Sequence, residues 1–310
     1  MNLSVYLFSY NRGRQLKNCI RSIEICAPAL PTTIIDDNST DPNTQEVLAK
    51  LTGKYRIIQP GACRNMNVSK YGGLYANMNL ALREAASQGV RYALFIQDDM
   101  QFVRPFEAVD SSNLEVYFSS NLKNFELHTC FMKQEYIQYD RQHSVLDETR
   151  VAYHRLNKAV PGNKHFSDVG VFHIERTREI LNAFETGELA NEELAKRRGA
   201  RLGFYAFPFM MWLPFPESFR GKQRNLLHRA METLGGSGFY PVKYMTDDEV
   251  KRLFDRDLRC LPVAEKLLVS PDAPSAHYWS TAGGAANTRA RGYWRSLMGR
   301  ILLNIDKLTT

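Results

Sequence analysis

Apolar residues in the first hundred positions form short continuous runs that alternate with longer segments of helical spacing. The continuous runs predict buried strands at residues 3–8, 32–35, 55–58 and 92–96. The segments between them predict amphipathic helices at residues 14–26, 43–51 and 72–87. This alternation, with short connections, is typical of a parallel sheet whose faces are covered by helices.

Beyond residue 110 the alternation is less regular. The pattern there predicts a strand and two helices, at residues 169–174, 178–184 and 191–198. Residues 289–308 place apolar side chains at helical spacing among five basic residues and one acidic residue. We therefore expect an α/β domain with a mixed, mainly parallel sheet over residues 1–215, and a helical C-terminal extension over residues 216–310.

Polar residues follow three of the predicted strands directly. Asn11 comes after the first strand, Asp36 and Asp37 end the second, and Asp98 and Asp99 follow the fourth. The carboxyl ends of parallel strands meet at one edge of a sheet, and that edge is where such sheets bind ligands. We therefore expect these side chains to form one site. The alternative interpretation of residues 36–41 is a turn followed by a helix cap.

The adjacent carboxylates of Asp98 and Asp99 favour a bound cation. Neighbouring carboxylates repel each other, and burial raises the cost of ionising both. Mg²⁺ or Mn²⁺ removes that cost and commonly bridges one or two carboxylates to a substrate phosphate. The alternative interpretation is a solvated acidic turn. Because the pair ends an apolar strand, we favour the metal site.

Composition narrows the class of protein. Hydrophobic residues make up 44% of the 310 residues and charged residues 24%, which excludes intrinsic disorder. The 40 basic and 33 acidic residues give a net charge of +7, which favours anionic partners. The five cysteines are scattered, which argues against disulfides and zinc and favours a reducing compartment. No apolar run reaches the roughly 18 residues of a spanning helix, so we expect a cytoplasmic location.

Four short motifs follow one another along the chain, at residues 8–12 (FSYNR), 34–41 (IIDDNSTD), 72–82 (GGLYANMNLAL) and 95–100 (FIQDDM). In this order and spacing they resemble the motifs of family-2 glycosyltransferases with the GT-A fold. The resemblance covers residues 3–215. It implies a nucleotide-sugar-binding half over residues 1–105 and an acceptor-binding half over residues 106–215.

The resemblance also implies a nucleotide-sugar donor, with UDP as the commonest nucleotide of the family. Asp36 or Asp37 would hold the nucleoside, and Asp98 would touch the ribose or the sugar. The full set of implied donor-binding residues is Ser9, Tyr10, Asn11, Arg12, Asp36, Asp37, Gly73, Asn79 and Asp98. The implied ligands of the metal, Mn²⁺ or Mg²⁺, are Asp99 and Asp98, with His277 as a third candidate.

An inverting transferase needs a carboxylate that deprotonates the acceptor hydroxyl as it attacks the anomeric carbon. The family places this general base in an acidic motif that opens a helix, well beyond the metal motif. Residues 191–195 (NEELA) occupy that place, so Glu193 is the first candidate and Glu192 the second. Acidic residues on a solvated helix face are the other interpretation of these two. Asp168 is a rival base or acceptor contact.

The expected acceptor is a glycan or a lipid-linked saccharide. The basic segment at residues 289–308 suits either peripheral contact with an anionic membrane face or docking on the core. A sugar-phosphate nucleotidyltransferase shares the sheet and the metal, but it usually has a basic glycine-rich loop where this chain has residues 9–14 (SYNRGR). The net charge also leaves open a non-enzymatic nucleic-acid or glycan-binding protein. No nucleic-acid-binding motif occurs, so nucleic acid is not an expected partner.

Overall fold

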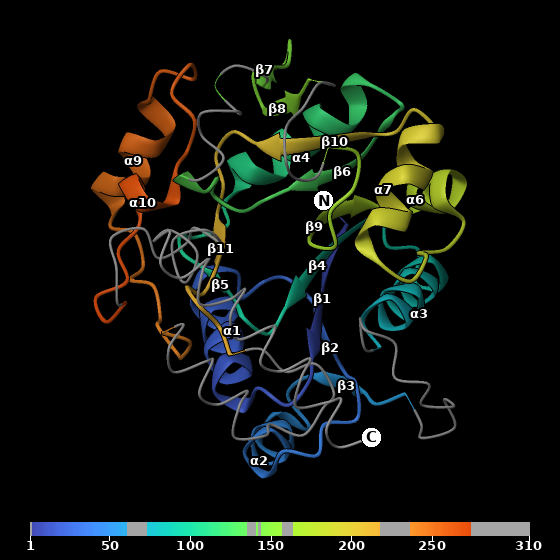
Figure 1. The fold of residues 1–310 in the computed structure, drawn as a ribbon, viewed down its shortest axis with the longest axis vertical. Helices are drawn as coiled ribbons and strands as arrows, with labels where there is room; N and C mark the ends of the chain where they lie inside the picture. The colour runs from blue at the N-terminus through green and yellow to red at the C-terminus, as the bar shows by residue number, and fades with distance from the viewer. Residues whose placement is uncertain are drawn as a thin grey trace, which may run out of the picture.

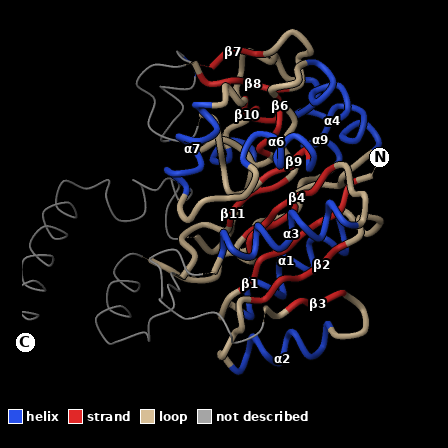
Figure 2. The backbone as a smooth tube through the Cα atoms, turned by 90° about the vertical axis from the view of Figure 1, so that its right-hand side faces the viewer, coloured by secondary structure: helices blue, strands red, loops and turns tan. Residues whose placement is uncertain are grey.

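The chain folds around one large mixed sheet, seen from two sides in Figure 1 and Figure 2. The computed structural model describes residues 2–60, 73–134, 141, 144–156, 164–217 and 236–273. Within these residues the large sheet has nine strands in the order β3-β2-β1-β4-β9-β6-β10-β8-β7. A second, two-stranded sheet consists of β11 and β5.

The four strands predicted from the first hundred residues are confirmed as parallel neighbours. In sheet order they are β3 (Arg56–Ile58), β2 (Thr32–Asp36), β1 (Leu3–Ser9) and β4 (Tyr92–Gln97). Ser9 of β1 lies beside Asp36 of β2, and Phe8 lies beside Gln97 of β4. These three strands therefore end level with one another, and the residues that follow them share one edge of the sheet.

The other half of the sheet mixes strand directions. It contains β9 (Gly170–His173), β6 (Asn124–His128), β10 (Arg201–Tyr205), β8 (Ala152–Arg155) and β7 (Ser144–Leu146). Strand β9 runs antiparallel to both of its neighbours, β4 and β6, and β8 runs antiparallel to β10 and β7. All other strands point the same way, so the predicted mixed, mainly parallel sheet is confirmed.

Helices cover both faces of the sheet. They are α1 (Gly13–Cys26), α2 (Pro42–Leu51), α3 (Leu74–Ser87), α4 (Ala108–Ser120), α6 (Ile174–Leu181), α7 (Glu188–Arg197), α9 (Asp247–Asp255) and α10 (Ala264–Leu267). Successive side chains of a strand point to opposite faces. Leu7 of β1 accordingly packs in the cluster that contains α1, whereas Phe8 packs in the cluster that contains α3 and α6. Figure 1 shows α1 on one side of the sheet and α3, α6 and α7 on the other.

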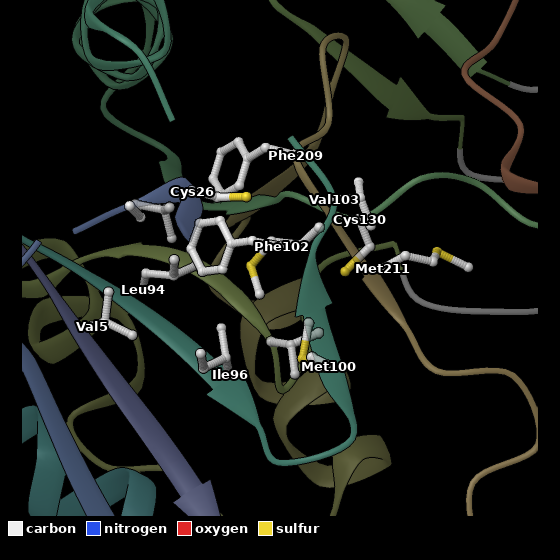
Figure 3. Close-up of a cluster of buried hydrophobic side chains, with 14 of the residues drawn as sticks. Val5, Cys26, Leu94, Ile96, Met100, Phe102, Val103, Cys130, Phe209 and Met211 are labelled. Carbon is white, nitrogen blue, oxygen red and sulfur yellow. The ribbon is translucent and has the colours of Figure 1, made fainter. Parts of the chain in front are cut away.

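A tight turn leads from β4 into β5 (Met100–Phe102), which pairs antiparallel with β11 (Met210–Trp212). Figure 3 shows Met100 and Phe102 in the same buried cluster as Ile96 of β4. Both ends of the turn are therefore anchored in the core. The two aspartates of the turn, residues 98 and 99, consequently have a fixed place at the edge of the sheet.

A buried ion pair ties α4 to the segment between β10 and β11. The side chains of Arg104 and Asp110 are fully buried, and two N–H groups of Arg104 donate to the two oxygens of Asp110 at 2.6 and 2.8 Å. The Tyr205 hydroxyl also donates to Asp110, at 2.8 Å. The Arg104 Nε–H donates to the carbonyl of Pro208 at 3.1 Å. Each buried charge is thereby paired and hydrogen-bonded, as its desolvation requires.

Residues 236–273 pack on the same core as the sheet. Val242, Met245 and Leu253 are buried in the cluster that contains α1 and the inner strands, and Gln101 of β5 donates to the carbonyl of Val242 at 2.6 Å. His277 and the basic segment at residues 289–308 lie outside the described residues. Among the helices of the described ranges, none is long and apolar enough to cross a membrane.

Candidate functional site

The edge formed by the carboxyl ends of β1, β2 and β4 brings together the residues that the sequence singled out. The backbone N–H of Asp37 donates to the carbonyl of Ser9 at 2.9 Å, and the N–H of Asp98 donates to the carbonyl of Phe8 at 3.0 Å. The loops that follow the three strands are thus joined by backbone hydrogen bonds. This is the ligand-binding edge expected of such a sheet.

Arg12 lies between the two carboxylates of the turn. Its Nη1 is 2.7 Å from Asp99 Oδ2 and 3.3 Å from Asp98 Oδ1, and the N–H of Tyr10 donates to Asp98 Oδ2 at 3.0 Å. Burial raises the pKa of Asp98 well above its usual range, although the Arg12 charge opposes this and the Asp99 charge adds to it. One guanidinium therefore contacts two buried carboxylates.

Asp99 has a buried oxygen suited to a cation. Its Oδ1 is inaccessible to solvent and accepts no hydrogen bond from any described residue. A buried carboxylate oxygen normally has a partner. The described residues contain no group of three or more side chains that would hold a metal by themselves. Mg²⁺ and Mn²⁺ do not need one, because they take one or two carboxylates and complete their coordination with phosphates and water. Asp99, with Asp98 beside it, therefore fits such a cation.

Asp36 and Asn11 shape the loops of this edge. Asp36 is fully buried and accepts hydrogen bonds from the Ser39 N–H at 2.8 Å and from the Ser39 hydroxyl at 2.5 Å. Asn11 Oδ1 accepts from the N–H groups of Thr40 and Asp41 at 2.7 and 2.8 Å. Asn11 also adopts a φ of 52°, a conformation that asparagine tolerates better than most residues. Both side chains therefore hold the loops after β1 and β2 together.

Ser9 and Tyr10 lie on the same edge. The Ser9 hydroxyl is buried and has no hydrogen-bond partner among the described residues. Burial raises the pKa of the Tyr10 hydroxyl, and the charges of Asp37 and Asp36 raise it further, so this ring faces the acidic end of β2. Both residues remain candidates for donor contacts.

Asp37 sits on the N-terminus of α3. Its oxygens accept from the Gly73 N–H at 3.0 Å and from Asn77 Nδ2 at 3.1 Å. A Cβ at position 73 would lie 2.1 Å from Asp37 Oδ1, so only glycine allows this approach. Asn79, further along α3, bonds through both ends of its amide to the backbone of Phe184, at 2.8 and 2.7 Å. Gly73 thus belongs to the edge, whereas the Asn79 amide ties α3 to the segment before α7.

A pocket of about 290 Å³ adjoins the carboxylate pair. Six of the residues that line it are His128, Lys133, Arg155, Asp168, Glu188 and Trp212. Two hydrogen bonds place this pocket near the turn. Gln97, the last residue of β4, donates through Nε2 to Asp168 Oδ2 at 3.1 Å, and the N–H of Leu213, which follows Trp212, donates to the carbonyl of Asp99 at 2.7 Å. A pocket of this size is at the lower end of the roughly 300–1,000 Å³ of ligand sites.

Two carboxylates share this pocket. Burial raises the pKa of Asp168 to about 7, and the charge of Glu188 is the next largest cause. Glu188 is the first residue of α7. It was not predicted from the sequence.

The two glutamates favoured by the sequence do not line the pocket. Glu192 accepts from the backbone N–H groups of residues 164, 165 and 166, the last two at 2.9 and 2.8 Å, and so anchors the segment before β9. Glu193 is 62% exposed and lies 3.5 Å from Lys196 on the outer face of α7. Helix α7 begins at Glu188, three residues before the predicted start. The acidic residue that opens the helix is therefore Glu188.

No protein-family model matches the chain, and no curated protein matches its sequence. Solved structures match part or most of it. They include S. aureus TarS 1–349, with 14% sequence identity and a TM-score of 0.41. The match covers 66% of this chain and 58% of TarS 1–349, so the chain spans little more than half the length of that fragment. The mannosyltransferase PcManGT from Pyrobaculum calidifontis, in complex with GDP-Man and Mn²⁺, is 14% identical (TM-score 0.42, 97% of this chain and 80% of that one). A cytidylyltransferase from Leptospira borgpetersenii is 8% identical (TM-score 0.37, 66% and 75%).

Proposed function

We propose that the chain is a metal-dependent, inverting glycosyltransferase that moves a sugar from a nucleotide-sugar donor to a hydroxyl of a glycan or lipid-linked saccharide. The observation that carries this proposal is the buried pair Asp98–Asp99. It lies at the carboxyl edge of parallel strands, has an oxygen suited to a cation, and adjoins a pocket that contains two more carboxylates. UDP is the nucleotide that we expect.

In this proposal Asp99, assisted by Asp98, would hold Mn²⁺ or Mg²⁺. The bound cation would supply positive charge that neutralises the leaving nucleoside diphosphate. Arg12 contacts both aspartates and lies at the same edge. It offsets part of their charge in the free protein. The loops held by Asn11, Asp36 and Asp37 form the surface that receives the nucleoside.

We assign the general base to Glu188 rather than to Glu193 or Glu192. Glu188 lines the pocket and is the acidic residue at the start of α7, whereas the family resemblance had placed the base at residues 191–195. It takes the proton of the acceptor hydroxyl while that oxygen attacks the anomeric carbon. Asp168 is the second carboxylate of the pocket. We assign it an acceptor contact, because its hydrogen bond from Gln97 fixes it beside the turn.

The test is a donor panel that includes UDP- and GDP-linked sugars, with Mn²⁺ or with EDTA. We expect metal-dependent binding of one donor by calorimetry and slow release of nucleoside diphosphate. Glu188→Gln should keep donor binding and lose transfer, and the exposed Glu193→Gln is the matched control. Loss of transfer in Glu193→Gln with full activity in Glu188→Gln would refute the assignment of the base. Release of pyrophosphate from a nucleoside triphosphate and a sugar phosphate would instead identify a nucleotidyltransferase.

A further inference from the structure

The pocket beside the carboxylate pair has one basic, aromatic side. Lys133 Nζ lies 4.7 Å from the centre of the Trp212 ring, and Arg155 Cζ lies 4.2 Å from the centre of the Phe204 ring. All four side chains line the pocket, and we call them the cationic wall. A cation over an aromatic face is held in place by the ring quadrupole. The wall therefore presents two positive charges at defined positions.

His128 connects the two halves of the cationic wall. Its ring centre lies 5.3 Å from those of Phe204 and Trp212, and only 7% of the residue is exposed. Its buried Nδ1 has no hydrogen-bond partner among the described residues. Burial lowers the pKa of His128 to about 3, and the charges of Arg155 and Lys133 lower it further. The imidazole is thus neutral, and the positive charge of this side comes from Lys133 and Arg155.

The carboxylates belong to other elements of the pocket. Asp168 precedes β9 and Glu188 opens α7, whereas Lys133 follows β6 and Arg155 ends β8. The sequence positions are far apart, so the fold brings these charges into one pocket. The acidic side suits a hydroxyl group, and the cationic wall suits an anionic group on the same ligand.

We propose that the cationic wall binds a negatively charged group, a phosphate or a carboxylate, on the acceptor saccharide. The inference rests on the proposed function and specifies its acceptor as anionic. The acidic side receives the reacting hydroxyl, while Lys133 and Arg155 hold the charged group and Trp212 supports the sugar ring. Arginine forms paired hydrogen bonds to either anion, and lysine acts as a point charge. A pocket of about 290 Å³ suits a single charged saccharide unit.

The test compares matched probes that differ only in charge: glucose, glucose 6-phosphate and glucuronate. Binding is followed by the change in tryptophan fluorescence, with Trp212→Phe to assign the signal. We expect both anionic probes to bind roughly 10–100-fold more tightly than glucose, as is typical of charged hydrogen bonds. Lys133→Met and Arg155→Gln should each remove most of this preference. The exposed lysine variant Lys196→Gln is the control.

Charge-conserving variants distinguish the loss of a positive charge from the loss of folded protein. Lys133→Arg and Arg155→Lys should retain the preference for the anionic probes in part. Equal binding of the three probes, or an equal loss of all three in Lys133→Met, would overturn the inference. A preference for glucose 6-phosphate over glucuronate would name phosphate as the group, and the reverse order would name carboxylate. Failure of the proposed function is seen separately, as absent metal-dependent donor binding in a protein that still prefers the anionic probes.

Discussion

Asp168→Asn should stabilise the metal-free protein at alkaline pH, although it alters the candidate site. Burial, followed by the charge of Glu188, raises the pKa of Asp168 from its usual 3.8 to about 7 in the folded protein. The folded state then holds this proton more tightly than the unfolded state. The contribution of Asp168 to stability is therefore least unfavourable near pH 4, worsens as the pH rises toward 7, and is fully unfavourable above 7.

The size of the effect follows from the pKa. At about 1.4 kcal/mol for each pKa unit, ionised Asp168 would cost the fold roughly 4 kcal/mol. The side chain borders an open pocket, where solvent reduces electrostatic effects, so we expect Asp168→Asn to add about 1–3 kcal/mol at pH 8. Asparagine can still bond to Gln97, whose amide now donates to Asp168 at 3.1 Å. The gain should shrink toward zero as the pH falls to about 4.

The assay is urea unfolding in EDTA at pH 5, 6, 7 and 8, followed by circular dichroism. Glu193→Gln is the control, because that side chain is 62% exposed and should show no such trend. If the difference between Asp168→Asn and the parent protein did not grow with pH, the pocket would not hold a carboxylate with a raised pKa. The same variant should lose transfer activity while it keeps donor binding.

Three further predictions concern the supports of the site. Arg104→Met should lower the free energy of unfolding by about 3–5 kcal/mol, because it leaves the buried Asp110 charge unpaired. Urea titration measures this difference. The control is Lys50→Met in the exposed pair with Glu46, which should leave the free energy of unfolding unchanged. Gly73→Ala should weaken donor binding roughly 10-fold, because a Cβ at this position would lie 2.1 Å from Asp37 Oδ1. Calorimetry measures the dissociation constant of the donor. The control variant Ser87→Ala, at the other end of α3, should bind the donor as the parent does. Arg12→Gln should tighten Mn²⁺ binding to the protein without donor, because Arg12 Nη1 lies 2.7 Å from Asp99 and its charge competes with the cation. Weaker Mn²⁺ binding in this variant would contradict the prediction.

The sheet edge could be predicted because its signals are local. Asn11, Asp36 and Asp98 come at the carboxyl ends of the apolar runs that form β1, β2 and β4. The order of strands and polar residues can therefore be recognised in the sequence. Burial then decides how each polar residue is used. Asn11 and Asp36 satisfy backbone groups of neighbouring loops, a role that the turn interpretation of residues 36–41 allows.

Of the pocket residues, the sequence singled out only Asp168, because the others converge only in the folded chain. Lys133 and Arg155 come from segments with no motif, and they meet through the pairing of β6, β10 and β8. The start of α7 was missed because its N-cap residue, Gly187, has a φ of 113° and no side chain to mark the cap. With that boundary corrected, Glu188 takes the position that the sequence assigned to Glu193. His277 and the basic segment at residues 289–308 stay predictions.

The central claim is that Asp99 binds a divalent cation that a nucleotide-sugar donor needs. Calorimetric titration of the donor panel into the protein, with Mn²⁺ or with EDTA, tests it most directly when the parent is compared with Asp99→Asn. We predict that one donor binds the parent only with Mn²⁺, that Asp99→Asn does not bind it under either condition, and that Glu188→Gln binds it normally. Donor binding that is equal with Mn²⁺ and EDTA, or unchanged in Asp99→Asn, would contradict the account.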